Sequence, residues 1–270
     1  MTIAGSDSGG GAGIEADLRT FAALGVHGTA ALTAITAQNT HEVRAVCALE
    51  AEMVRTQVET VSDDIDVSAV KTGMLARPAT VRIVATLAAE GRLPNLVVDP
   101  VLVTSSGHPL MEPGGVEAYR ELLLVHATVA TPNLREAAVL IGIDVRDISS
   151  IDAMAEAGSA ICLLGPRAVV VKGGHFQSGA VTETRAPDVV VSSSGVRVLE
   201  ATRVVTRNDH GTGCSLAAAI AALLARGESV DDAIDGAKAF VLRALVGAAN
   251  WHIGSGHGPI DHMGWGDGQA

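Results

Sequence analysis

Hydrophobic and polar positions along the chain follow two alternating patterns. Short runs rich in valine, isoleucine and threonine, typical of buried strands, are separated by longer alanine- and leucine-rich runs with helical spacing. These patterns predict strands at residues 2–4, 31–38, 69–74, 96–101, 127–131 and 168–172. They predict helices at residues 14–24, 51–62, 78–90, 134–141, 151–164, 213–226 and 230–249. The first strand is short enough to suggest that residues precede it.

The order of these segments indicates the fold class. Strands and helices alternate, which predicts an α/β fold with a mostly parallel, doubly wound sheet and helices on both faces. Continuous apolar strands such as the one in VVDPV fit a sheet that is buried on both sides. Apolar and polar residues alternate one by one along residues 181–200, which predicts a small antiparallel hairpin.

No linker or internal repeat interrupts this pattern. We therefore expect one domain over residues 1–263 and a flexible tail over residues 264–270. The glycine-rich stretch from Gly254 is expected to be loose. Its His257 and His262 are interpreted as tail residues rather than metal ligands.

The composition narrows the classes of function. The chain has 270 residues, a net charge of −11 and no basic cluster, so we expect no nucleic-acid partner and no anionic membrane surface. Its three cysteines are far apart and form no CxxC pair. No apolar run reaches the roughly 18 residues of a membrane span. These features are typical of a cytoplasmic protein.

The sequence Gly211-Thr212-Gly213-Cys214 stands directly before a long apolar run. The first N–H groups of a helix have no acceptor within the helix and lie at the positive end of its dipole, so they can bind an anion. The same field would lower the pKa of the Cys214 thiol. The alternative is a plain helix start with a buried cysteine.

Three further polar clusters follow predicted strands, where ligands of doubly wound sheets bind. Asp99 ends a buried run and requires a cation nearby. Asn133 and Glu136 begin a helix three residues apart and form either a helix cap or a ligand-binding pair. Lys172 either faces a phosphate beside its glycines or extends to solvent. Together these clusters supply the cation, anion site and Mg²⁺ ligands that phosphoryl transfer needs.

The first glycine-rich loop, from Gly5 to Gly13, supports a rival class. Read from Gly11, it matches a form of the dinucleotide fingerprint, which would indicate a nucleotide-binding dehydrogenase. Several extra residues separate this fingerprint from the preceding strand, and no acidic residue closes the second strand. A Walker A lysine is also absent. A flexible loop with helix-capping residues is the remaining interpretation.

Seven segments occur together in a characteristic order: AGSDSGGGAGIEADLRTF, TAITAQNT, KTGML, VVDPV, TPNLREA, VVKGGH and HGTGC. In these seven segments the chain resembles the hydroxymethylpyrimidine/phosphomethylpyrimidine kinases of thiamin biosynthesis, which belong to the ribokinase-like superfamily. The resemblance runs from Thr2 to about Met263. It implies a ribokinase-like three-layer fold. It also implies ATP-dependent phosphorylation of 4-amino-5-hydroxymethyl-2-methylpyrimidine, and then of its monophosphate to the diphosphate.

The resemblance also assigns residues. Gln38 of AQNT would read the pyrimidine edge, since an amide offers both a donor and an acceptor. Cys214 and Lys172 would form the catalytic centre. The other residues carried over are Asp17, Met74 and Val101 in the substrate pocket, Asn133, Lys172, Gly211, Thr212 and Gly213 at the ATP phosphates, and Asp99 and Glu136 at Mg²⁺. A homodimer is a further expectation from the resemblance, and a monovalent-cation requirement is left open.

Two positions depart from the family pattern. Ser8-Gly9 replaces the usual Pro-Ser or Ser-Ser, and Ser105 stands where a lysine is often found, which removes one expected phosphate contact. A pyridoxal kinase of the same superfamily is the close alternative, because some such proteins share the HGTGC signature. A non-catalytic regulatory domain is disfavoured by the intact Lys172 and anion site.

Overall fold

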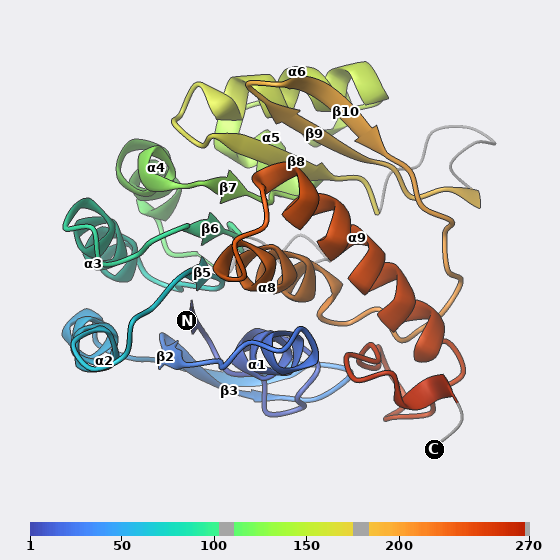
Figure 1. Ribbon diagram of the computed structural model, residues 1–270, viewed down its shortest axis with the longest axis horizontal. Coiled ribbons are helices and arrows are strands. Elements are labelled where there is room, and N and C mark those ends of the chain that lie inside the picture. The colour runs from blue at the N-terminus through green and yellow to red at the C-terminus, as the bar shows by residue number, and fades with distance from the viewer. Residues whose placement is uncertain (103–110, 175–183, 268–270) are drawn as a thin grey trace.

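The main sheet of the protein has eight strands in the order β10-β9-β8-β7-β6-β5-β1-β2 (Figure 1). The computed structural model describes residues 1–102, 111–174 and 184–267. In this sheet β2, β1, β5, β6, β7 and β8 run parallel to one another, and β9 runs antiparallel to both β8 and β10. The strands are β1 (Thr2–Ala4), β2 (Ala30–Leu32), β5 (Lys71–Thr72), β6 (Val97–Val98), β7 (Val129–Ala130), β8 (Ala168–Lys172), β9 (Asp188–Ser192) and β10 (Gly195–Leu199). The predicted mostly parallel sheet is confirmed, and so is the antiparallel hairpin, which β9 and β10 form; residues 181–183 of its predicted range lie outside the described residues.

Helices cover both faces of this sheet and make three layers (Figure 1). Because neighbouring strand residues point to opposite faces, Val97 and Val98 of β6 enter two different hydrophobic clusters. One face packs against α1 (Gly13–Ala23), α8 (Thr212–Ala225) and α9 (Val230–Gly247). The other packs against α2 (Ala51–Ser62), α3 (Pro78–Ala89), α5 (Leu134–Ile141) and α6 (Ile151–Cys162). No helix among the described residues is long and apolar enough to cross a membrane.

Short helical elements that the sequence patterns did not predict connect the longer ones. They are α4 (Gly115–Ala118), a π-helical turn (Tyr119–Leu123), and 3₁₀ turns at Leu124–His126, Val145–Asp147 and Trp265–Asp267. Tyr119 is fully buried in the same cluster as α3, so the turn fills the sheet face between α3 and α5.

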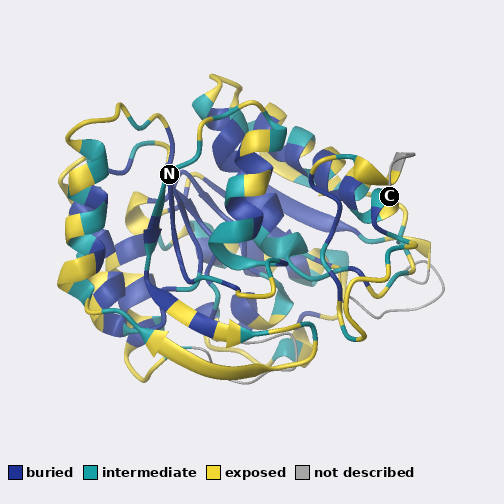
Figure 2. Ribbon diagram, turned by 90° about the horizontal axis from the view of Figure 1, so that it is seen from below, coloured by how far each residue is buried: buried dark blue, intermediate teal, exposed yellow. Residues whose placement is uncertain are grey.

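The predicted strand at residues 31–38 is wrong in one respect, because the chain leaves the main sheet at Thr33. The Thr33 hydroxyl donates to the Met74 carbonyl at 2.6 Å, and the following residues form β3 (Ala34–Gln38). This strand pairs with β4 (Val43–Ala48) in a separate two-stranded ribbon. Almost every residue of β4 is exposed (Figure 2), so it lacks the alternation that would have predicted a strand.

The stretch from Gly254 is not loose, contrary to the sequence-based expectation. We refer to residues 251–266 as the C-terminal strap; in Figure 1 they form the red chain beyond α9. Asp261 accepts hydrogen bonds from the backbone N–H groups of Trp265 and Gly266, at 3.0 and 2.7 Å. His262 is buried, and its Nε2 lies 2.8 Å from the Ser215 hydroxyl. Residues 268–270 of the predicted tail lie outside the described residues.

The buried His262 gives a pH-dependent stability. Burial, with a smaller contribution from Arg19, lowers the pKa of His262 from 6.5 to about 4. The folded imidazole is therefore neutral between these values, while the unfolded chain binds a proton there. The stability is fully present above pH 6.5 and is lost as the pH falls towards 4, by about 3 kcal/mol in all.

We expect the His262→Gln variant to lose this dependence. Urea unfolding between pH 4.5 and 7 should give a shallower pH dependence of the free energy of unfolding than in the wild type. The matched control is His252→Gln, since His252 is an exposed histidine of the same strap. Parallel pH curves for His262→Gln and the wild type would contradict the expectation.

Candidate active site

Polar residues at the carboxyl ends of β6, β7 and β8 meet at one edge of the sheet. Lys172, the last residue of β8, places its Nζ 2.7 Å from Oδ1 of Asp99, which directly follows β6. The Thr131 hydroxyl donates to the same oxygen at 3.0 Å. Burial alone would lower the pKa of Lys172, but Asp99 and Glu136 together raise it. Lys172 is therefore the cation that the buried Asp99 requires.

Asn133 and Glu136 form a capping box at the start of α5. The Asn133 side-chain oxygen accepts from the Glu136 N–H at 3.0 Å, and a Glu136 carboxylate oxygen accepts from the Asn133 N–H at 2.7 Å. Burial raises the pKa of Glu136 to about 8, Lys172 acts in the opposite direction, and Asp99 raises it further. The helix-cap interpretation is thus correct. The same arrangement places the buried carboxyl groups of Asp99 and Glu136 near Lys172.

The N-terminus of α8 faces this lysine. Gly211 has a φ of 85° and begins the helix, and Thr212 and Gly213 form its first turn. A Cβ atom at Gly213 would lie 3.2 Å from the Nζ of Lys172, so any larger residue would crowd the ammonium group. The first-turn N–H groups and Lys172 therefore offer positive charge to one place.

Cys214 is partly buried in the first turn of α8. Burial raises the pKa of its thiol; Lys71 lowers it, while Asp17 and Asp99 raise it. The expectation of a lowered pKa, based on the helix dipole, is therefore wrong. The loss of hydration and the two carboxylates outweigh the effect of Lys71, and the thiol is neutral.

Asp17 lies beneath this site as half of a buried ion pair. Its two carboxylate oxygens are 3.0 and 2.8 Å from the Nζ of Lys71, and the Thr2 hydroxyl donates to it at 2.6 Å. Neither Asp17 nor Lys71 has any exposed side-chain surface. A direct contact of Asp17 with a substrate would require this pair to open, so its role as a pocket residue stays a prediction.

Gln38 approaches the α8 loop through His210. Its backbone N–H donates to the Ser8 hydroxyl, and that hydroxyl lies 2.8 Å from the Gln38 carbonyl. The Gln38 amide nitrogen is 3.1 Å from Nε2 of His210, which precedes Gly211. The partly buried Met74 lies behind Gly5, where a Cβ atom would be 2.5 Å from its terminal methyl group.

The first glycine loop is organised around Asp7. Its carboxylate accepts from the N–H groups of Gly9, Gly11 and Ala12 at 2.8 to 3.0 Å, and lies 2.9 Å from Nε2 of His210. Burial would raise the pKa of Asp7, but the bonds from His210 and the backbone lower it overall. These N–H groups are already satisfied, so they do not form the pyrophosphate site of a dinucleotide-binding protein.

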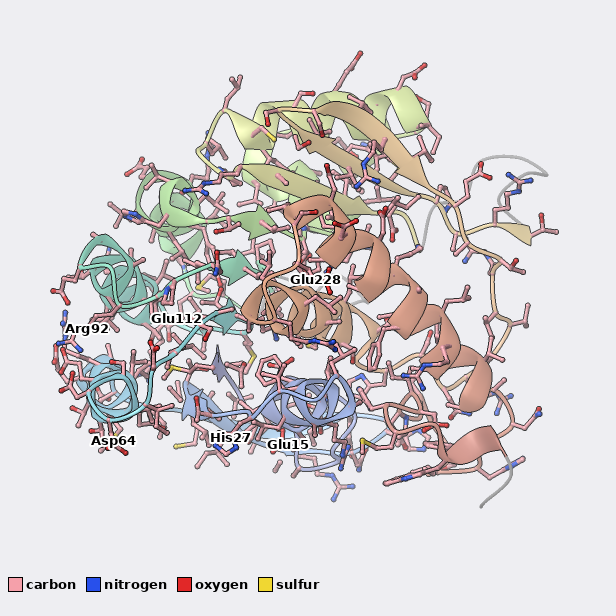
Figure 3. All side chains as sticks on the ribbon, viewed as in Figure 1. Glu15, His27, Asp64, Arg92, Glu112 and Glu228 are labelled. Carbon is pink, nitrogen blue, oxygen red and sulfur yellow. The ribbon has the colours of Figure 1, made fainter. Side chains whose placement is uncertain are left out.

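Glu15 and Gly211 fix this loop from two sides. Glu15, labelled on α1 in Figure 3, accepts from the Asp7 backbone N–H at 2.8 Å. A Cβ atom at Gly211 would lie 1.9 Å from the Gly11 carbonyl oxygen, so the two glycine loops touch backbone to backbone. This contact explains why glycine is needed at Gly211 beyond its positive φ.

Val101 is partly buried just after Asp99, and Ser105 lies outside the described residues. Sequence reasoning missed Asp7, His210 and Lys71 as parts of the site. Asp7 and His210 stood within the quoted glycine motifs. Lys71 could have been found from the sequence, because a charged residue inside the predicted buried strand at residues 69–74 requires a buried partner of opposite charge.

The three-layer sheet and this edge site define a phosphotransferase of the ribokinase-like class. The chain belongs to the phosphomethylpyrimidine kinase family, whose model matches residues 7–261. A hydroxymethylpyrimidine/phosphomethylpyrimidine kinase of Rhizobium meliloti is 48% identical over 97% of this chain and 96% of its own length.

Two solved structures show the same fold. A phosphomethylpyrimidine kinase of Clostridium difficile is 37% identical, has a TM-score of 0.78, and covers 90% of this chain and 97% of its own. An ADP complex of Bacillus subtilis pyridoxal kinase is 38% identical, has a TM-score of 0.86, and covers 97% and 96% of the two chains. Both substrate classes therefore occur among similar structures.

Proposed function

We propose that the protein transfers the γ-phosphate of ATP to 4-amino-5-hydroxymethyl-2-methylpyrimidine, and then to the monophosphate to give the diphosphate. Family membership supports this activity, as does the identity to the Rhizobium meliloti kinase. The single observation that carries it is the contact between a candidate phosphate-binding group and the candidate pyrimidine-binding residue Gln38. Lys172 and the α8 N-terminus form a phosphate-binding half, and His210 of the same loop contacts the Gln38 amide.

Each residue then has a defined role. Gln38 and Met74 hold the pyrimidine, with the amide bonded to the ring edge. Lys172 and the N–H groups from Gly211 to Gly213 hold the phosphate oxygens while negative charge moves between them. The neutral Cys214 thiol lies at the acceptor side of the same helix turn.

Asp99 and Glu136 fit a divalent cation. They are both buried, and Lys172 is the lysine that contacts Asp99 and acts on Glu136. Among the residues that the structure describes, no three His, Cys, Asp or Glu side chains form a metal cluster. A Mg²⁺ ion here would take its other ligands from water and phosphate oxygens, as Mg²⁺ commonly does. When bound, it would neutralise charge on the triphosphate.

Phosphorus NMR tests the function. The protein is incubated with ATP, Mg²⁺ and the pyrimidine alcohol, and the products are followed in time. Successive appearance of a monophosphate and a diphosphate is expected. A monophosphate alone would remove the second step, and no phosphorylated pyrimidine would refute the proposal.

Pyridoxal phosphorylation is the second candidate, favoured by the similarity to the Bacillus subtilis pyridoxal kinase. We expect the pyrimidine to be the better substrate, because Gln38 can bond both a ring nitrogen and an exocyclic amine. Comparison of kcat/KM for the two alcohols under identical conditions decides between them. A higher value for pyridoxal would reverse the assignment.

The Gln38→Ala variant should have a raised KM for the pyrimidine and a nearly unchanged KM for ATP. A buried ring edge without its hydrogen bonds costs about 1–3 kcal/mol, which is roughly a ten- to hundredfold loss in kcat/KM. Steady-state kinetics with each substrate varied in turn measure this. Val46→Ala, an exposed residue of the same ribbon, is the control. Unchanged pyrimidine kinetics would exclude Gln38 from the pocket.

A further inference from the structure

The C-terminal strap holds the loop that precedes α8. The Gly258 N–H donates to the Arg207 carbonyl and the His210 N–H donates to the Gly258 carbonyl, both at 3.1 Å. The buried Asn208 extends its amide to the Trp251 carbonyl at 3.0 Å. The strap therefore fixes the loop immediately before Gly211 by backbone pairing.

The strap also holds the first turn of α8 itself, through His262. Nε2 of this histidine lies 2.8 Å from the hydroxyl of Ser215, and both residues are buried. A neutral imidazole has one donor and one acceptor nitrogen, and a hydroxyl can donate or accept, so either tautomer forms this hydrogen bond. Ser215 directly follows Cys214 in the sequence.

A third set of contacts joins the strap to the turn that follows Gln38. The His257 N–H donates to the Thr40 carbonyl at 2.9 Å, and the Gly256 N–H donates to the Thr40 hydroxyl at 3.2 Å. A Cβ atom at Gly256 would lie 2.1 Å from the Thr40 carbonyl oxygen. The strap therefore touches both the Gln38 turn and the α8 loop.

We propose that the C-terminal strap is a positioning element for the anion site, and that His262 sets the position of the α8 N-terminus through Ser215. His262 does not reach the reacting atoms. It acts by fixing the first turn, whose N–H groups must meet the phosphate oxygens in one arrangement. A displacement of about 1 Å in such a group can cost about a hundredfold in rate. This inference rests on the kinase function proposed above.

A double-mutant cycle tests the inference. We expect His262→Ala and Ser215→Ala each to lower kcat roughly ten- to hundredfold per folded molecule, with little change in KM for the pyrimidine. The double variant should lose no more than either single variant, because both remove one interaction. His262→Gln keeps an amide that can donate to or accept from the Ser215 hydroxyl and should restore most of kcat. His252→Ala, at an exposed position of the strap, should behave like the wild type.

A second readout does not depend on kinase activity. The rate of Cys214 alkylation by iodoacetamide, followed by peptide mass spectrometry, reports the position of the first turn. It should rise in His262→Ala and stay unchanged in His252→Ala. An inactive wild type would refute the kinase function but leave this readout intact. The inference is overturned if His262→Ala has wild-type kcat and alkylation with only a lower Tm, or if the losses in the cycle are additive.

Discussion

Replacing Lys172 with methionine is expected to lower kcat by about a hundred- to a thousandfold, the usual cost of removing one positive group from a developing anion. The ammonium group lies beside Gly213 and 2.7 Å from Asp99, so the variant loses both the phosphate contact and the charge balance of the edge. KM for the pyrimidine should change little, because Gln38 is untouched. Single-turnover measurements at saturating ATP and Mg²⁺ separate the chemical step from product release.

The Lys172→Met variant is also expected to be less stable, so its loss of rate must be separated from its loss of folded protein. Asp99 is left buried without its cation in Lys172→Met, which destabilises a fold by about 3–5 kcal/mol in comparable cases. Rates are therefore compared per folded molecule, with the folded fraction taken from urea unfolding. Lys172→Arg keeps the charge and should keep the fold with an intermediate rate. Wild-type kcat in folded Lys172→Met would show that the lysine is purely structural.

The second large effect concerns Cys214 and should differ between the two phosphorylation steps. The first acceptor is an alcohol with a proton to lose, and the second is a phosphate that is already anionic. In Cys214→Asp, the new carboxylate would repel this phosphate by about 4 kcal/mol for unit charges roughly 4 Å apart at an effective dielectric near 20. That corresponds to roughly a thousandfold loss in the second step. The first step should be preserved better.

Cys214→Ala provides the opposite test. It removes a sulfur atom that can accept a hydrogen bond from the attacking alcohol, so the first step should suffer more than the second. The two steps are measured separately, with the alcohol and the monophosphate as starting substrates. A neutral thiol, which burial near Asp17 and Asp99 favours, is compatible with both acceptors. Equal losses in both steps for both variants would leave Cys214 as a packing residue.

The fold was largely predictable because its strands are short, apolar and separated by well-formed helices. Residues such as Ala168–Lys172 and Leu134–Ile141 have the predicted bounds, since periodicity and capping agree there. The edge site was predictable in outline as well. Polar residues after parallel strands meet at one edge, so Asp99 and Lys172 could be expected close together.

Other features depend on contacts between distant segments that no local pattern reveals. The ion pair of Asp17 and Lys71 joins residues of α1 and β5, and the charged Asp17 occupies a helix face that would be expected to be apolar. His262 is more than 40 residues from Ser215, and glycines around it suggested a loose tail. The pKa of Cys214 was predicted in the wrong direction, since the sequence shows the helix start but not the depth of burial.

The backbone contact between Gly11 and Gly211 also links the evolution of two loops. No side chain fits at position 211 while the Gly11 carbonyl stays in place, and a side chain at Gly11 would meet the His210 ring at 2.5 Å. Substitution in either loop is thus conditional on the shape of the other. Across the family, we expect positions 11 and 211 to change in concert, with a larger residue at 211 confined to lineages whose first loop has gained or lost residues.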